Sequence, residues 1–107
     1  MMNFLRKNIK YPHSAMELGL QGIVYVSFVI DTSGLVTDVK VNKGISRPNL
    51  GRNEQDKKLV AEYEDALAKM NEEAMRIFRI MPKWGSGKID GKKVKVFLTY
   101  PIFYKMQ

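Results

Sequence analysis

Residues 94–105 read Val-Lys-Val-Phe-Leu-Thr-Tyr-Pro-Ile-Phe-Tyr-Lys, and this stretch decides the fold. Every second residue is apolar or aromatic, and the side chains of a β-strand alternate between its two faces. The stretch therefore predicts a strand with one buried face, formed by Val94, Val96, Leu98, Tyr100, Ile102 and Tyr104. The opposite face is mixed and carries both lysines; it comprises Lys95, Phe97, Thr99, Pro101, Phe103 and Lys105.

Pro101 indicates where this strand lies in its sheet. Proline has no N–H for a β-ladder, so within sheets it is tolerated at edges and bulges. The last strand is therefore predicted at a sheet edge, with an unpaired side around Pro101. Such an edge is either protected by charged residues, here Lys95 and Lys105, or used to bind a strand from a partner.

The composition is that of one globular domain with a single modest core. The chain has 107 residues, of which 45% are hydrophobic and 27% charged. It has no cysteine, which excludes disulfides and thiolate chemistry. No run reaches the roughly 20 apolar residues that span a bilayer, and residues 1–10 are too polar for a signal peptide. The chain is expected either in the cytosol or as a soluble part of a longer protein.

The net charge of +7 favours an anionic partner, such as nucleic acid, lipid headgroups or an acidic peptide. The basic residues are distributed along the chain without a long run. Solubility, or orientation near a charged surface, explains the excess equally well.

Two short helices are predicted before the first strand. Residues 3–10 show an amphipathic pattern, and Pro12 suits the first turn of a second helix that Gly19 would end. His13, the single histidine, falls in that second helix. Without a second histidine or a cysteine it is expected at the surface rather than in a metal or catalytic site.

Residues 22–31 and 35–42 predict a β-hairpin. Both faces of the first strand are largely apolar, as expected for a central strand that is covered more fully than an edge. Asp31 and Gly34 provide the turn between the strands. The apolar positions of the second strand fall out of phase, which predicts a bulge near Thr37 and Asp38.

A helical pattern with apolar residues at three- and four-residue steps begins at Glu54 and ends before Pro82. Asn71, followed by two glutamates, could cap a new helix, so one long helix or two remain open. Residues 82–93 are predicted as a glycine-rich basic loop. Its Gly-Ser-Gly-Lys lacks the spacing of a phosphate-binding loop, and Trp84 is expected to fill the core where helix meets sheet.

No arrangement of residues indicates catalysis. The acids lie mostly on the predicted solvent face of the long helix, and no Ser–His or Cys–His pair can be argued. We therefore expect no enzyme activity, no cofactor and no metal.

These elements predict an α+β fold, in which a three-stranded antiparallel sheet has helices packed on one face. The hairpin strands pair directly, and a right-handed crossover through the long helix places the last strand beside the first. The predicted strand order is second, first, last, within a single domain over residues 1–107.

Several motifs, in this order, resemble the TonB C-terminal domain family. They are Tyr11-Pro12 with Ala15 and Gly19, residues 22–31, residues 34–41, Gly44-Ile45, Glu73-Ala74, Arg76, residues 81–84, Gly87-Lys88, Gly91-Lys92 and the Tyr-Pro-Ile-Phe of residues 100–103. The resemblance spans about residues 4–104 and is greatest to energy transducers of the Bacteroidetes type. Residues 46–69 depart from the family pattern and are interpreted as a helical insertion.

The resemblance implies the periplasmic domain of an energy transducer. Family members are anchored to the inner membrane by a helix upstream of the domain and are driven by a proton-powered motor complex. The domain binds a short segment, the TonB box, of an outer-membrane transporter, and force then remodels the plug of the transporter. Some relatives carry the domain on membrane-bound sensors or peptidases, which is an alternative setting for this chain.

The expected binding mode is strand addition, with the box segment paired to the open edge of the last strand. Partner contacts are expected at Lys92, Lys93, Lys95, Phe97, Thr99, Phe103 and Lys105, where the lysines attract an acidic segment. Two alternatives stay open. A polyanion or nucleic acid could stack on Tyr25, Phe97 and Phe103, although the absence of an RNA-binding motif makes nucleic acid the less favoured partner. Two copies could also pair or exchange their last strands as a homodimer.

Overall fold

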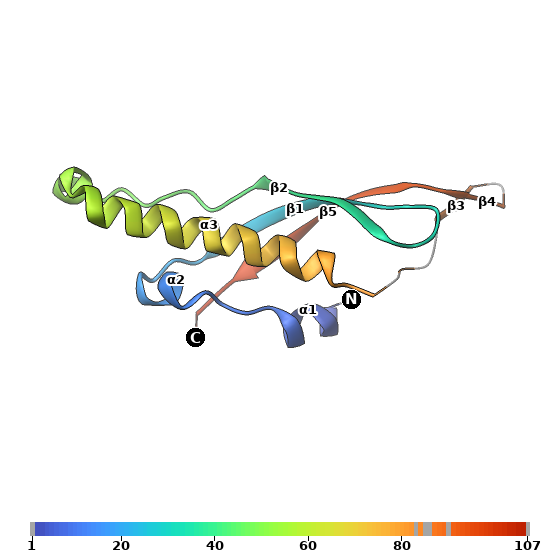
Figure 1. The fold of residues 1–107 in the computed structure, drawn as a ribbon, viewed down its shortest axis with the longest axis horizontal. Helices are drawn as coiled ribbons and strands as arrows, with labels where there is room; N and C mark the ends of the chain where they lie inside the picture. Colours follow the sequence, from blue (N-terminus) through green and yellow to red (C-terminus); the bar gives the residue numbers. More distant parts are fainter. Residues whose placement is uncertain (1, 83, 85–86, 90, 107) are drawn as a thin grey trace.

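The computed structural model describes residues 2–82, 84, 87–89 and 91–106. Its elements, in chain order, are α1 (Met2–Asn8), α2 (His13–Glu17), β1 (Gly22–Ile30), β2 (Val36–Lys43), the 3-10 helix η1 (Gly51–Gln55), α3 (Lys57–Arg79), β3 (Gly87–Ile89), β4 (Lys92–Val94) and β5 (Val96–Tyr104). The molecule is elongated, with extents of 60 × 23 × 17 Å. The β3–β4 hairpin and the η1 end of α3 extend past the sheet at opposite ends (Figure 1).

The main sheet has three antiparallel strands in the order β2-β1-β5. This confirms the predicted order and places β5 at an edge. The helix α3 lies along one face of the sheet (Figure 1). Pairing between β1 and β5 is regular from Gly22–Tyr104 to Ile30–Val96. The long helix thus acts as the crossover that brings the last strand beside the first.

The core lies between the inner face of β1 and the sheet-facing side of α3. On β1 the alternating residues Val24, Val26, Phe28 and Ile30 are buried. The rings of Phe28 and Phe78 stack with centroids 4.7 Å apart. Each large side chain buried in this way contributes about 1.5–3 kcal/mol. From α3 the buried residues are Ala66, Met70, Ala74, Ile77 and Phe78.

Trp84 fills the junction of helix and sheet, as predicted. Its ring lies 5.8 Å from that of Phe28 between centroids, and its backbone N–H donates to the Gly34 carbonyl at 2.8 Å. Gly34 has φ +86°, and a Cβ at this position would lie 2.1 Å from the Trp84 carbonyl oxygen. Only glycine therefore fits where these two segments meet.

The long helical segment forms one continuous helix, α3, rather than two helices. The Asp56 side chain caps α3 by accepting from the Leu59 N–H at 3.1 Å. Asn71 lies in the helix interior and caps nothing. Met81, which fits the helical periodicity, lies beyond the last helical residue, Arg79. The additional helix start suggested at Asn71 is therefore wrong.

The predicted turn and bulge are both present. The Asp31 carboxylate accepts from the backbone N–H groups of Ser33 and Leu35 at 2.8 and 2.9 Å. The pairing of β2 with β1 shifts at the predicted bulge, where Asp38 has φ +52°. A second shift, nearer the end of β2, was not predicted. Together these shifts return the valines of β2 to the core face.

Gly19 ends α2 as expected, in the left-handed region with φ +70°. The Leu20 N–H donates to the Ala15 carbonyl at 2.9 Å and the Gly19 N–H to the Met16 carbonyl at 3.1 Å. This is a Schellman motif. His13 is on the surface, 2.8 Å from the Glu17 carboxylate.

The prediction that residues 82–93 form only a loop is wrong. This segment contains β3 and β4, which pair as a two-stranded ribbon. Each strand is three residues long, too short for alternation to be visible in a lysine-rich sequence. Within the described residues, none of the helices has the length and apolar character needed to span a membrane.

Candidate functional site: the open edge of β5

The backbone direction of β5 follows from bonds made by β1 and its neighbours. The Asp31 N–H donates to the Leu35 carbonyl in the β1–β2 turn, and the Val29 carbonyl accepts from the Thr37 hydroxyl on β2 at 3.4 Å. Odd-numbered residues of β1 therefore direct their main-chain groups toward β2, and even-numbered residues direct theirs toward β5. The β1–β5 register is unbroken, so the even-numbered residues of β5 face β1.

The odd-numbered residues of β5 consequently face away from the sheet. The N–H and C=O groups of Phe97, Thr99 and Phe103, and the C=O of Pro101, lie along the open edge. In the described part of the chain, β1 is the only strand paired with β5. A row of main-chain donors and acceptors is thus available to a further strand.

The side chains of the same residues lie on the outer face of the sheet, opposite α3. Phe97 is 76% exposed and Phe103 62% exposed, which is unusual for aromatic side chains. Between them, the Ser27 and Thr99 hydroxyls lie 3.2 Å apart in hydrogen-bond contact. The outer face therefore presents two exposed aromatic rings separated by a polar pair.

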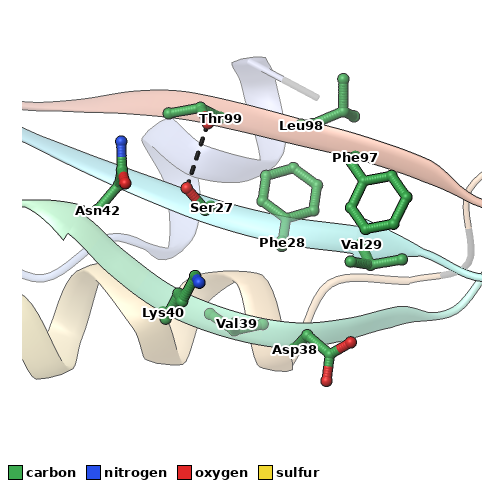
Figure 2. Close-up of a pocket in the computed structure, with 10 residues that line it drawn as sticks. All are labelled: Ser27, Phe28, Val29, Asp38, Val39, Lys40, Asn42, Phe97, Leu98 and Thr99. Atoms are coloured by element: carbon green, nitrogen blue, oxygen red, sulfur yellow. Dashed lines mark hydrogen bonds between the residues drawn. The ribbon is translucent and has the colours of Figure 1, made fainter.

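Two shallow grooves lie on this part of the molecule. The first is lined by residues of all three strands of the main sheet, and Figure 2 shows Phe97 beside Val29 with the Ser27–Thr99 hydrogen bond next to them. The second groove lies at the other end of β5 and is lined by Gln21, Gly22, Ile23, Phe103, Tyr104 and Lys105. Both are open depressions rather than enclosed cavities, a shape that suits an extended chain better than a small molecule.

The predicted lysines flank this edge. Lys92 and Lys93 lie on β4, and Lys95 lies between β4 and β5. Lys105 directly follows β5 at its other end, about 30 Å away at the usual rise of a strand. All four are exposed, and the described residues 91–106 contain no acidic side chain. The potential along the edge is therefore positive at both ends.

A second polar cluster fastens the N-terminal segment to α3. The Glu73 carboxylate accepts from the Lys10 backbone N–H at 2.6 Å and from Arg76 at 2.6 and 2.8 Å. Arg76 also donates to the Asn8 carbonyl at 2.9 Å. Burial alone would raise the pKa of Glu73, but the hydrogen bonds from Arg76 and Lys10 outweigh it and lower the pKa. The Glu73 carboxylate is therefore charged when it accepts the hydrogen bonds that attach the N-terminal segment to α3.

Two tyrosines complete the attachment between the N-terminal segment and the sheet. The Tyr11 hydroxyl donates to the Leu20 carbonyl, and its ring packs edge-on against Tyr104 at 5.3 Å between centroids. Tyr104, at the end of β5, donates to the Met70 carbonyl of α3 at 2.6 Å. Burial raises the pKa of Tyr104 well above its usual range, and it also raises the pKa of Tyr11. Both phenols stay neutral at physiological pH.

The structure brings Phe97, Thr99 and Phe103 together on one face and one edge of β5. Lys95 and Lys105 continue that edge, whereas Lys92 and Lys93 lie on the β3–β4 ribbon. Sequence reasoning did not identify the contacts of Glu73 and Arg76 with the N-terminal segment. These residues were recognised only as part of a motif, because their partners are more than sixty positions away. In the described residues, no cluster of three or more His, Cys, Asp or Glu side chains could hold a metal ion.

Comparison with known proteins extends these observations. The family model described as the Gram-negative bacterial TonB protein C-terminal matches residues 7–55. That family is transport-related and non-enzymatic; its domain is periplasmic in Gram-negative bacteria, and its members interact with outer-membrane transporters. The matched segment includes α2, β1 and β2, and it ends before α3 and β5. The comparison with curated proteins gave no match.

Two solved structures are similar to this chain. One is an NMR solution structure of the TonB C-terminal domain of Helicobacter pylori, with 24% identity, coverage of 99% of this chain and 77% of that chain, and a TM-score of 0.53. The other is a shorter version of the same domain, with 27% identity, coverage of 96% and 86%, and a TM-score of 0.49. The first match shows that the fold is that of a TonB C-terminal domain.

Proposed function

We propose that this chain is the periplasmic domain of a TonB-like energy transducer of the Bacteroidetes type. It binds the TonB box of outer-membrane transporters by strand addition and transmits force for active uptake. The observation that carries this proposal is the open edge of β5, where the main-chain groups of Phe97, Thr99 and Phe103 face outward. The family and fold similarities support it.

Strand addition suits this edge because main-chain hydrogen bonds tolerate many guest sequences, while neighbouring side chains set the preference. Guest residues opposite Phe97 and Phe103 would project onto the same outer face as these rings. Apolar guest side chains there would cover exposed aromatic surface. Lys92, Lys93, Lys95 and Lys105 would attract acidic residues at the ends of the guest.

Transmission of force requires that the load reach the guest without unfolding the domain. In the proposed parent protein, the load enters through a segment upstream of the domain that connects to the motor complex in the inner membrane. The contacts of Glu73 and Arg76 with the N-terminal segment, and the Tyr11–Tyr104 packing, connect that segment to α3 and β5. A guest ladder pulled along its strands must break several hydrogen bonds together, which favours resistance to load.

The residues 46–69 that we interpret as an insertion form a loop, η1 and the N-terminal half of α3. The Glu54 carboxylate organises the loop by accepting from the Leu50 N–H at 2.7 Å and from the Arg47 guanidinium at 2.9 Å. These bonds, with that to Leu50 the stronger influence, lower the pKa of Glu54. This arm extends away from the open edge of β5 (Figure 1), so it is not required for strand addition.

The test is an NMR titration of the domain with peptides that carry the box segments of transporters from the source organism. We expect the largest amide shifts at Phe97, Thr99 and Phe103, and slower hydrogen exchange at the same amides in the complex. Shifts confined to residues 46–69 would reject the edge as the binding site. A single-stranded oligonucleotide that displaces the peptide from the same residues would favour polyanion binding instead.

Reversing the charge of two lysines tests how much the lysines at the edge contribute to peptide binding. The double variant Lys95→Glu with Lys105→Glu should weaken peptide binding on the order of ten-fold at low salt, with a smaller effect at high salt. The matched control is Lys57→Glu with Lys58→Glu, which makes the same change of charge at the exposed start of α3. Equal weakening by both double variants would mean that net charge, rather than the edge, governs binding.

A further inference from the structure

A single residue interrupts the open edge of β5 near its middle. Pro101 pairs with Tyr25 of β1, and its main chain faces outward like that of Thr99 and Phe103. Proline costs nothing on the β1 side here, because a residue at this position directs no N–H toward β1. Its effect is confined to the open side, where it offers a carbonyl acceptor but no donor.

The side-chain surface is divided at the same place. One groove reaches Phe97 and Thr99, and the other reaches Phe103 and Lys105. Pro101 lines neither of them. A strand bound at this edge therefore meets two short pairing segments, separated by a position at which one of its carbonyls receives no hydrogen bond.

A foreign guest strand meets this gap once, whereas a second copy of β5 meets it twice. Two copies that pair antiparallel about a two-fold axis each place a proline on the other. In a register centred on Pro101, the Pro101 residues of the two copies lie directly opposite each other. Neither then has a backbone N–H to donate to the carbonyl of the other. Any other two-fold register places each proline opposite a residue whose carbonyl then lacks a donor.

The charges of the lysines also disfavour pairing between two copies of β5. The two-fold register that matches Phe97 with Phe103 of a second copy also places Lys95 opposite Lys105 of that copy, and does so at both ends of the pair. Like charges directly opposite each other in a ladder are destabilising. An acidic guest would instead find two complementary ends.

We propose that Pro101 is a specificity-determining residue of the β5 edge, which lets it accept one foreign acidic strand while disfavouring a second copy of itself. This inference rests on the proposed function, since it assigns the edge to a guest strand. It predicts a monomer whose edge stays available to the guest. The lysines at the two ends reinforce the effect of the proline.

The experiment compares the wild-type domain with Pro101→Ala, which restores the outward N–H without changing the β1 side. Each restored hydrogen bond is worth about a five-fold change in an equilibrium constant. Sedimentation at several concentrations should show self-association about thirty-fold tighter in Pro101→Ala, with slowed hydrogen exchange at Phe97 and Phe103. Binding of the box peptide should tighten by only about five-fold. The matched control is Pro48→Ala in the exposed loop after β2, which should leave both constants unchanged.

A second variant tests the contribution of charge. Adding Lys95→Glu to Pro101→Ala makes the two ends of a self-paired edge complementary and should tighten self-association further, most at low salt. The proposal is overturned if Pro101→Ala self-associates no more tightly than the wild type, or if the wild type already pairs through β5 with the same constant. In either case a box peptide that still binds at β5 leaves the proposed function intact. A peptide that binds elsewhere, or not at all, removes the proposed function instead.

Discussion

The contact between Gly34 and Trp84 makes the sharpest prediction for stability. Gly34→Ala places a methyl group in a position with φ +86°, and that group would lie 2.1 Å from the Trp84 carbonyl oxygen. A side chain in the left-handed region costs about 1–2 kcal/mol. Because the clashing atom belongs to the backbone, the clash cannot be relieved by rotating a side chain.

Relief of the clash must therefore move the segment that carries Trp84. This movement breaks the hydrogen bond between the Trp84 N–H and the Gly34 carbonyl, worth about 1 kcal/mol. It also loosens the packing of Trp84 against Phe28, with a further loss on the order of 1 kcal/mol. We expect Gly34→Ala to reduce the free energy of unfolding by about 3–4 kcal/mol.

The control is Gly19→Ala. Gly19 has a similar φ of +70°, but a Cβ there would have no atom within 4 Å. This variant should lose only the backbone term of about 1–2 kcal/mol. Urea unfolding followed by circular dichroism measures both losses, and the fluorescence of Trp84, the single tryptophan, should shift to the red only in Gly34→Ala. Equal losses for the two variants, with an unchanged Trp84 spectrum, would refute the argument.

Three further predictions concern α3 and its contacts. Tyr104→Phe removes the hydrogen bond to Met70 and should cost about 1 kcal/mol at neutral pH. Because burial raises the pKa of Tyr104 in the folded state, wild-type stability should fall as the pH rises above about 10, and Tyr104→Phe should show a weaker fall in alkaline urea titrations. Glu73→Gln should lower the free energy of unfolding by about 1–2 kcal/mol at pH 7. Since the folded-state pKa of Glu73 is lowered, the difference in stability between this variant and the wild type should vanish as the pH falls below about 4. A difference that persists in acid would contradict the ionic role of Glu73. Asp56→Ala removes the cap of α3 and should cost about 1 kcal/mol in thermal or urea unfolding, whereas Asp65→Ala, which breaks only the surface pair with Lys69, should cost less than about 0.5 kcal/mol.

The strand pattern of residues 94–105 carried most of the fold prediction, and for a physical reason. Alternation separated a buried face from an exposed one, and the structure buries or half-buries the predicted inner residues while Phe97 and Phe103 stay exposed. Pro101 independently indicated an edge, which the strand order confirms. Both inferences depend on local backbone geometry alone, so no knowledge of distant residues was needed.

Local chemistry also predicted the turn at Asp31–Gly34, the bulge at Asp38 and the end of α2 at Gly19. It failed where the outcome depended on competition between segments. A helix start at Asn71 is reasonable in isolation, but the buried Met70 and Ala74 hold the helix against the sheet on both sides of it. The β3–β4 ribbon was missed because its short strands are defined by pairing with each other rather than by pattern.

The sequence by itself determined which residues of β5 lie on the exposed face, because side-chain alternation is a property of a single strand. Only the tertiary structure decided which main-chain groups are open, since that depends on the register with β1 and on which side β2 already occupies. The same holds for the contacts of Glu73 and Arg76 with the N-terminal segment, which join residues more than sixty positions apart. The direction of the main-chain groups of β5 and the partners of Glu73 and Arg76 are set by pairing between distant segments, and no local sequence pattern encodes them.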